Sequence, residues 1–248
     1  MRWSCFHQLK SYDVDSLLKS KYNDYLLDTP EQQFDVTLKF DLNNLPSDTD
    51  DLLKEIGQLK RNALAAPFVL AFKNQIAGQV NNPPMVVNYR EGEAIYVHSQ
   101  ADRVTVIFTI TFKEEMDRVF GKVFLQEFVD ARRQPAIQNA PQVIYSSRDP
   151  PGELKGAEGL IEGKDIGYVT FVIEPRHYQT PENEEKTINL IQLFRDYLHY
   201  HIKCSKAYMH SRMRSRVSEF LKVLTRAKPE KGDKEKKTAT GRTFRRAV

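Results

Sequence analysis

The chain has 248 residues, of which 40% are hydrophobic, enough to fill one large domain or two small ones. Its two cysteines cannot form a disulfide framework, its first residues lack the apolar run of a secretory signal, and no stretch approaches the ~18 apolar residues of a membrane span. We therefore expect a reduced, cytosolic protein without a transmembrane segment.

The first 80 residues predict a small α+β unit. Residues 3–10 are predicted to form a short strand, and residues 13–27 a helix, because apolar residues recur there at spacings of three and four. Residues 34–42 alternate between apolar and polar, which is typical of a half-buried strand. A helix over residues 49–73 follows, and Pro67 is expected to kink it.

Residues 81–84, Asn-Asn-Pro-Pro, form the clearest linker. After the linker, the sequence predicts a second α+β series. Its strands are expected at residues 85–89, 94–98, 103–112, 143–145 and 167–173, with a helix over residues 114–133. The turn from Arg90 to Glu93 makes the first two strands a hairpin.

The order of elements suggests two similar domains, each with an antiparallel sheet packed on helices, although no residue-level repeat is visible. The first domain would cover residues 1–80 and lack its opening strands. The second would cover residues 85–227, followed by a basic flexible tail over residues 228–248. A naturally short N-terminus and a chain cut from a longer parent both fit. We favour the second, because a truncated sheet leaves an unpaired edge.

A single long helix is predicted from about residue 180 to 227. Apolar residues keep helical spacing throughout, no glycine or proline lies between Pro181 and residue 227, and glutamates cluster at the start. At 1.5 Å per residue the helix would be roughly 70 Å long. Much of its apolar stripe must therefore cover a second domain or a partner chain.

No pattern in the sequence supports catalysis or metal binding. His199 and His201 are two residues apart on the predicted helix, on different sides, so they cannot share a metal. Cys204 lies in mid-helix, away from a helix start that would activate its thiol. We expect a non-enzymatic protein without cofactor or metal.

Charge is strongly segregated along the chain. Residues 199–248 contain 15 lysines and arginines against four acidic residues, a net charge of +11, whereas the first 198 residues carry a net charge of −7. A helix surface that is only solvated usually interleaves both signs. The basic end therefore favours a docking surface for a large acidic partner.

Several motifs in this chain are similar to those of one known family. The long helix contains Thr187-Ile188-Asn189-Leu190-Ile191 and the run Phe194-Arg195-Asp196-Tyr197-Leu198-His199-Tyr200-His201-Ile202-Lys203-Cys204-Ser205-Lys206-Ala207-Tyr208. Further matches are Leu59-Lys60-Arg61-Asn62, Asp102-Arg103-Val104-Thr105-Val106, Gly121-Lys122-Val123-Phe124, Ala140-Pro141-Gln142-Val143 and Gly167-Tyr168-Val169-Thr170-Phe171-Val172. In these motifs the chain resembles subunit 2 of the actin-related protein 2/3 complex.

The resemblance implies a non-enzymatic scaffold of two α+β domains plus a long C-terminal helix. It implies pairing with subunit 4, contact with the side of the mother actin filament during branch nucleation, and a place in the cytoplasmic actin cytoskeleton. Family members begin with a further helix and strands that this chain lacks, which agrees with the truncated first domain.

The resemblance also assigns candidate sites on the long helix, since actin filaments are acidic. The expected filament-binding residues are Lys203, Lys206, Arg212, Arg214 and Lys222. Packing at a subunit or filament interface is assigned to Phe194, Tyr197, Leu198, Ile202 and Tyr208. For Phe194 and Tyr197, the sequence alone favours core packing.

The alternative is a module that binds nucleic acid or an anionic membrane through the same basic helix and tail. The tail has few aromatic residues to stack on bases, and the helix lacks a clean division into apolar and basic faces. We therefore expect no nucleic-acid partner.

Overall fold

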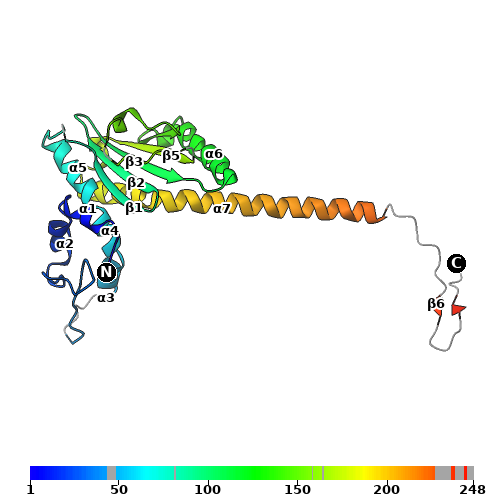
Figure 1. Ribbon diagram of the computed structural model, residues 1–248, viewed down its shortest axis with the longest axis horizontal. Helices are drawn as coiled ribbons and strands as arrows, with labels where there is room; N and C mark the ends of the chain where they lie inside the picture. The colour runs from blue at the N-terminus through cyan, green and yellow to red at the C-terminus, as the bar shows by residue number, and fades with distance from the viewer. Residues whose placement is uncertain are drawn as a thin grey trace. The chain divides into compact units, whose positions relative to one another are not determined.

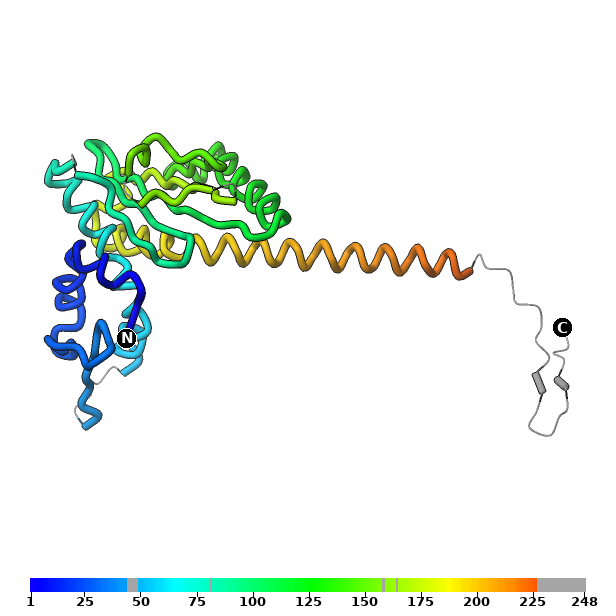
Figure 2. Tube along the Cα trace, in the orientation of Figure 1, coloured from blue at the N-terminus to red at the C-terminus, as the bar shows by residue number. Residues whose placement is uncertain are grey.

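The computed structural model describes residues 1–43, 49–80, 82–157, 159–163 and 165–226, and the backbone of 236–237 and 243–244. The chain divides into two compact units, Met1–Ile202 and Lys203–Val248, which are described separately. Figure 1 labels the elements, and Figure 2 traces the chain from its N-terminus to its C-terminus.

One antiparallel sheet of five strands forms the centre of the first unit (Figure 1), in the order β1-β2-β3-β5-β4. The strands are β1 (Met85–Arg90), β2 (Glu93–Ser99), β3 (Val104–Thr111), β4 (Gln142–Ser147) and β5 (Ile166–Ile173). They confirm the five strands expected after residue 84. The central pair, β3 and β5, is in register from Val104 opposite Ile173 to Thr111 opposite Ile166.

The two faces of this sheet are covered by different elements. Residues of β2, β3 and β5 such as Val97, Phe108 and Phe171 join the main core with helices α5 (Ala66–Ile76), α6 (Glu115–Ala131) and α7 (Pro181–Arg226). The opposite face, with Tyr96 and Tyr168, is covered by the segment after β4. Because β5 is covered on both faces, its run Ile-Gly-Tyr-Val-Thr-Phe-Val-Ile is buried throughout.

Two glycines are required by this packing. Gly92, at φ +72°, supplies the left-handed residue of the turn between β1 and β2, which confirms the predicted hairpin. Gly121 lies where α6 crosses Phe112, and a Cβ atom there would stand 2.6 Å from the Cε1 atom of Phe112. A larger residue at position 121 would therefore displace either the helix or the ring.

The expected strands of the first 80 residues are not formed. Residues 6–10 are helix α1 (Phe6–Lys10), because Phe6 and Leu9 lie three residues apart and are buried together. Residues 34–42 contribute only an isolated bridge, between Leu26 and Leu38. The described residues before β1 offer no strand ladder for this segment to join. Both strand predictions are therefore wrong, and a second sheet domain is not shown.

The helix predicted over residues 13–27 is confirmed in shorter form as α2 (Val14–Tyr22). The single helix predicted over residues 49–73 is three helices, α3 (Thr49–Gly57), α4 (Leu59–Leu64) and α5. Pro67 has no N–H to donate, so it starts α5 rather than kinking a continuous helix. Helices α1, α2 and α4 and the first residue of α5 share a second hydrophobic core. Beside it the Asn62 amide donates to the Tyr22 hydroxyl at 2.8 Å.

Among the described residues of the first unit, 3-10 helices also lie at Pro135–Ile137, Gly152–Leu154 and Pro175–His177. In the second unit, α7 continues to Arg226, which confirms the long helix. Beyond it the structure describes only two short paired strands, β6 (Lys236–Lys237) and β7 (Thr243–Phe244). The prediction of a flexible tail over residues 228–248 otherwise falls outside the described residues, as does part of the linker, at Asn81.

Candidate interaction surface on helix α7

Helix α7 begins at a well-defined cap. The backbone N–H of Asn183 donates to the Thr180 hydroxyl at 3.2 Å, and that of Glu184 donates to the Thr180 carbonyl at 2.9 Å. Pro181 occupies the first turn, where its missing N–H costs nothing, and Glu182 and Glu184 place negative charge at the positive end of the helix dipole. Burial raises the pKa of Glu184 above its usual value.

One side of α7 is part of the main core of the first unit. Its buried residues recur at spacings of three and four and are Ile188, Ile191, Phe194, Leu198 and Ile202. The Phe194 ring meets those of Phe108, Phe128 and Phe171 at centroid distances of 5.9, 6.0 and 4.8 Å. Aromatic packing therefore fixes how this part of α7 lies against the sheet.

A buried ion pair joins the same part of α7 to the hairpin of β1 and β2. Arg195 donates to Glu93 in a two-point contact, Nε to Oε2 at 2.8 Å and Nη2 to Oε1 at 3.0 Å. Burial acts to lower the pKa of Arg195, but the hydrogen bonds and charge of Glu93 outweigh burial and raise it. The hydroxyl of Tyr89 also donates to Glu93, and burial beside this carboxylate raises the pKa of Tyr89.

The other side of α7 exposes large apolar side chains within the first unit. Leu190, Leu193, Tyr197 and Tyr200 are spaced by three, four and three residues and are between 50% and 71% exposed. Tyr197 and Tyr200 border His201, whose ring stacks on Phe124 of α6 with centroids 5.3 Å apart. This spacing is typical of a helix side that receives another helix.

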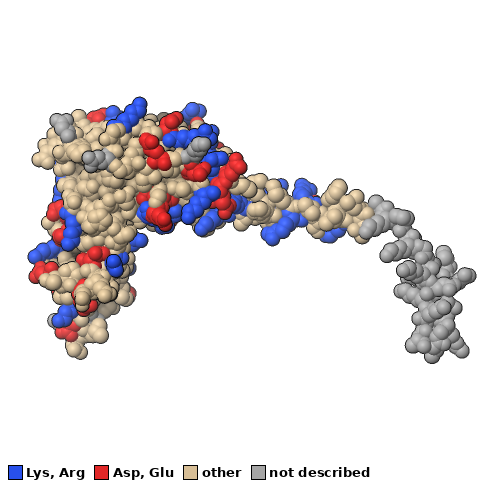
Figure 3. Space-filling model, viewed as in Figure 1, with Lys and Arg blue, Asp and Glu red and all other residues tan. Residues whose placement is uncertain are grey.

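The second unit contains the basic segment of α7, residues 203–226. Figure 3 shows blue side chains along this segment and no red one on the face drawn. Lys203, Arg212, Arg214 and Lys222 are exposed, and Lys206 is half-buried. At about 100° per residue, Lys203 and Arg214 lie within roughly 20° of each other around the axis, whereas Arg212 lies on the far side.

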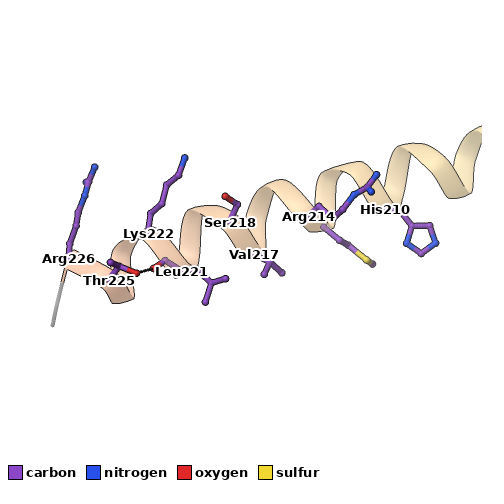
Figure 4. Close-up of a pocket in the computed structure, with 9 residues that line it drawn as sticks. His210, Arg214, Val217, Ser218, Leu221, Lys222, Thr225 and Arg226 are labelled. Carbon is purple, nitrogen blue, oxygen red and sulfur yellow. Dashed lines mark hydrogen bonds between the residues drawn. The ribbon is translucent and has the colours of Figure 1, made fainter.

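We call the set Lys203, Lys206, Arg214 and Lys222 the basic arc. An apolar arc begins one turn after Lys206, on the same side of the helix as Lys203 and Lys206, and then runs beside Arg214 and Lys222. Its side chains are between 38% and 64% exposed and are Met209, Met213, Val217, Phe220, Leu221 and Leu224. Figure 4 shows the boundary, with Arg214, Ser218 and Lys222 on one side of the helix and Val217 and Leu221 on the other. The division is local to these residues, since Arg216 lies on the apolar side and Lys206 shares the angular range of the apolar arc.

The structure thus separates the candidate residues into two groups. Phe194, Leu198 and Ile202 are buried in the chain's own core, so their side chains are not available to a partner. Tyr197 and Tyr208 are 50% and 62% exposed. The Arg212 guanidinium lies over the Tyr208 ring at 5.6 Å and donates to its hydroxyl at 2.9 Å, so the two side chains form one unit.

No constellation suited to chemistry accompanies this surface. The described ranges hold no group of three or more potential metal ligands. Cys204 is exposed and Cys5 is buried, and both are free thiols; burial raises the pKa of Cys5. Among the described helices, none is long and apolar enough to cross a membrane.

Sequence reasoning missed Arg195 and Glu93 as a pair. Arg195 lies within the motif that carried the family resemblance, but its partner is 102 residues away. The available signal was an acidic residue at the start of a strand. A single sequence does not show whether such a residue is buried or lies in an exposed turn.

Comparison with known proteins decides the family. Residues 1–231 match the family model described as the Arp2/3 complex 34 kD subunit, p34-Arc. The chain belongs to the p34-Arc family. It is 48% identical over 263 aligned positions to actin-related protein 2/3 complex subunit 2 of Schizosaccharomyces pombe, covering 98% of this chain and 82% of the relative. It is 44% identical to the subunit 2 of Dictyostelium discoideum, covering 93% of this chain and 77% of that relative.

The p34-Arc family is one of structural, non-enzymatic subunits. Membership of it confirms the resemblance drawn from the sequence motifs.

Proposed function

We propose that this chain is a scaffold subunit of an actin-related protein 2/3 complex and that the basic arc of α7 contacts the mother actin filament during nucleation of branches. The single observation that supports this best is the basic arc itself, three of whose four residues are exposed within a segment of net positive charge. Family membership supports actin as the acidic partner; charge alone would fit any polyanion.

The apolar sides of α7 have a separate role in this proposal. We infer that Leu190, Tyr197 and Tyr200 in the first unit, and the apolar arc in the second, are covered by the sister subunit 4. Monomeric soluble proteins rarely expose apolar side chains in such a continuous series. The partner would then leave the basic arc accessible to the filament, with Tyr208 beside Arg212 at its edge.

Charge reversal tests the filament contact. The variant Lys203→Glu/Lys206→Glu/Lys222→Glu should assemble into the complex but cosediment with actin filaments at least ten-fold more weakly, and branching should fall in parallel. A matched control is Lys122→Glu on α6, an exposed lysine outside the basic segment. Unchanged cosedimentation of the triple variant would remove the role assigned to the basic arc.

The dependence of filament binding on salt concentration is a second test of the same contact. Charges exposed on a helix surface are screened over about 8–10 Å at physiological ionic strength, so wild-type binding should weaken as salt increases. The triple variant should show a flatter dependence, because fewer charge contacts remain to be screened.

The division of α7 into basic and apolar arcs gives the membrane alternative a specific observation of its own. Vesicles containing phosphatidylserine, tested at the same salt concentration as filaments, separate the two functions. If the complex bound these vesicles and not filaments, the basic arc would be a membrane contact. Gel shifts with RNA and DNA at equal salt test the nucleic-acid alternative.

A further inference from the structure

A cavity in the first unit lies beside the Arg195–Glu93 ion pair, and its lining includes Leu193 of α7. Its volume is about 720 Å³, within the range of 300–1,000 Å³ that is typical of binding pockets. It is lined by the start of the chain, by α4, by strands β1 to β3 and by the early turns of α7. The proposal made for it below does not rest on the actin contact.

The floor of this cavity is apolar and well packed. Leu9, Ala63, Ile95 and Phe108 line it, and each is at most 6% exposed within the chain. These residues belong to both hydrophobic cores of the first unit, so the floor is held from two sides. A ligand here would bury apolar surface against a rigid base.

The rim is positively charged. Arg61, Arg90 and Arg195 line the cavity and are each paired with a carboxylate: Arg61 with Glu185, Arg90 with Asp196, and Arg195 with Glu93. Arg2 and Lys60 also line it, and within the described part of the chain neither of them forms an ion pair. Arg2 and Lys60 therefore place two positive charges beside the apolar floor, where they can pair with carboxylates of a ligand.

The rim also contains an exposed apolar side chain next to the floor. Leu193 lines the cavity and is 61% exposed, so a small molecule enclosed below would leave it in water. A polypeptide that crosses the rim would cover Leu193 and bring several side chains to the floor at once. Such a segment fits the cavity if it carries carboxylates beside its apolar residues.

We propose that this cavity is a docking site for an acidic, amphipathic polypeptide segment of another protein. Its apolar side chains contact the floor and Leu193, and its carboxylates pair with Arg2 and Lys60. The cavity is thus an interaction surface separate from both arcs of α7, with a partner defined by charge and amphipathicity.

The chain carries its own reporter for a test. Trp3 lines the cavity and is the single tryptophan of the sequence. The probe is a synthetic 14-residue peptide with leucines at helical spacing, flanking glutamates, and neither tryptophan nor tyrosine. Titrated into the full chain, it should shift Trp3 emission to shorter wavelength and saturate. The same peptide with lysines in place of glutamates should cause no shift.

Two pairs of variants locate the contact. Lys60→Glu should weaken peptide binding roughly five-fold, as expected for reversing one partly exposed charge, whereas Lys122→Glu on α6 should leave it unchanged. Leu193→Ser should weaken binding, whereas Leu190→Ser, on the same helix, 71% exposed and outside the cavity lining, should not. All four positions are exposed, and circular dichroism verifies the fold of each variant.

Three results would overturn the proposal. They are the absence of a saturable Trp3 response, an equal response to the lysine peptide, and equal effects from the two leucine variants. Displacement of the peptide by decanoate below its micellar concentration would show that a small amphiphile, and not a polypeptide, is the ligand.

Discussion

Replacing Arg195 with methionine removes the ion pair that joins α7 to the β1–β2 hairpin. Glu93 is 3% exposed, and the Arg195 side chain is 19% exposed. In the variant, Glu93 would keep only the Tyr89 hydroxyl at 3.2 Å and the Thr111 N–H at 3.4 Å as donors. A buried carboxylate would thus lose its only two-point cationic partner.

The burial of Glu93 sets the size of the expected loss in the free energy of unfolding. Breaking a buried pair by removing one partner costs about 3–5 kcal/mol, and the partial exposure of Arg195 places the expected loss near the lower value. For a folded region of about 200 residues, a loss of about 3 kcal/mol lowers the melting temperature by roughly 6–12 °C. The double variant Glu93→Gln/Arg195→Met leaves no unpaired charge and should recover more than half of the loss.

Thermal unfolding followed by circular dichroism measures both variants. The matched control is Arg90→Met, which removes an ion pair with Asp196 whose two side chains are 48% and 65% exposed. That variant should lose less than about 1 kcal/mol. If Arg195→Met were as mild as Arg90→Met, or if the double variant were less stable than Arg195→Met alone, the reasoning from burial would be refuted.

Three further predictions concern packing, pH and solubility. Gly121→Ala should lower the free energy of unfolding by about 1–3 kcal/mol in urea titrations, because its Cβ atom would meet Phe112, whereas Gly152→Ala, with no atom within 4 Å, should be neutral. Burial raises the pKa of Tyr178 to about 12, so the stability it contributes is present below pH 10 and lost as pH rises toward 12; the fall in stability between pH 8 and pH 11 should be smaller in Tyr178→Phe. An equal fall in both proteins would contradict this assignment. Purified alone, the chain should self-associate in light scattering, and Met213→Ser/Val217→Ser/Leu224→Ser should reduce this association; no change would indicate that the apolar arc is not responsible.

The sequence predicted the second half of the fold well because its periodic signals agree with its tertiary packing. Strands β3 and β5 and helices α6 and α7 lie within about three residues of their predicted limits. Residues such as Val104 to Ile110 are β-branched and aromatic, and they are buried where such residues fit a sheet.

The first half was predicted less well, since its short segments depend on their surroundings. Residues 34–42 alternate as a strand does, yet alternation alone cannot supply a neighbouring strand. Residues 6–10 are too few for their periodicity to separate helix from strand. Leu9 and Leu18, for example, are buried in the second hydrophobic core, whose members come from separate segments of the chain.

The candidate surface was predicted in composition but not in arrangement. Lys203 and Arg214 share one side of α7, and Arg212 faces away, which follows from helical geometry once the helix is certain. That Phe194 is buried and Tyr197 exposed depends on how α7 lies against α6 and the sheet. The cavity beside Trp3 could not be predicted, because its lining comes from segments far apart in the sequence.

The most direct test of the central claim compares the two sides of the basic segment in one assay. Complexes carrying Lys203→Glu/Arg214→Glu/Lys222→Glu are compared with complexes carrying Arg212→Glu/Arg216→Glu, and the dissociation constant for actin filaments is measured by cosedimentation at fixed salt. The account predicts a loss of at least ten-fold for the first set and less than three-fold for the second. Equal losses, or a larger loss for Arg212 and Arg216, would contradict the claim that the basic arc contacts the filament.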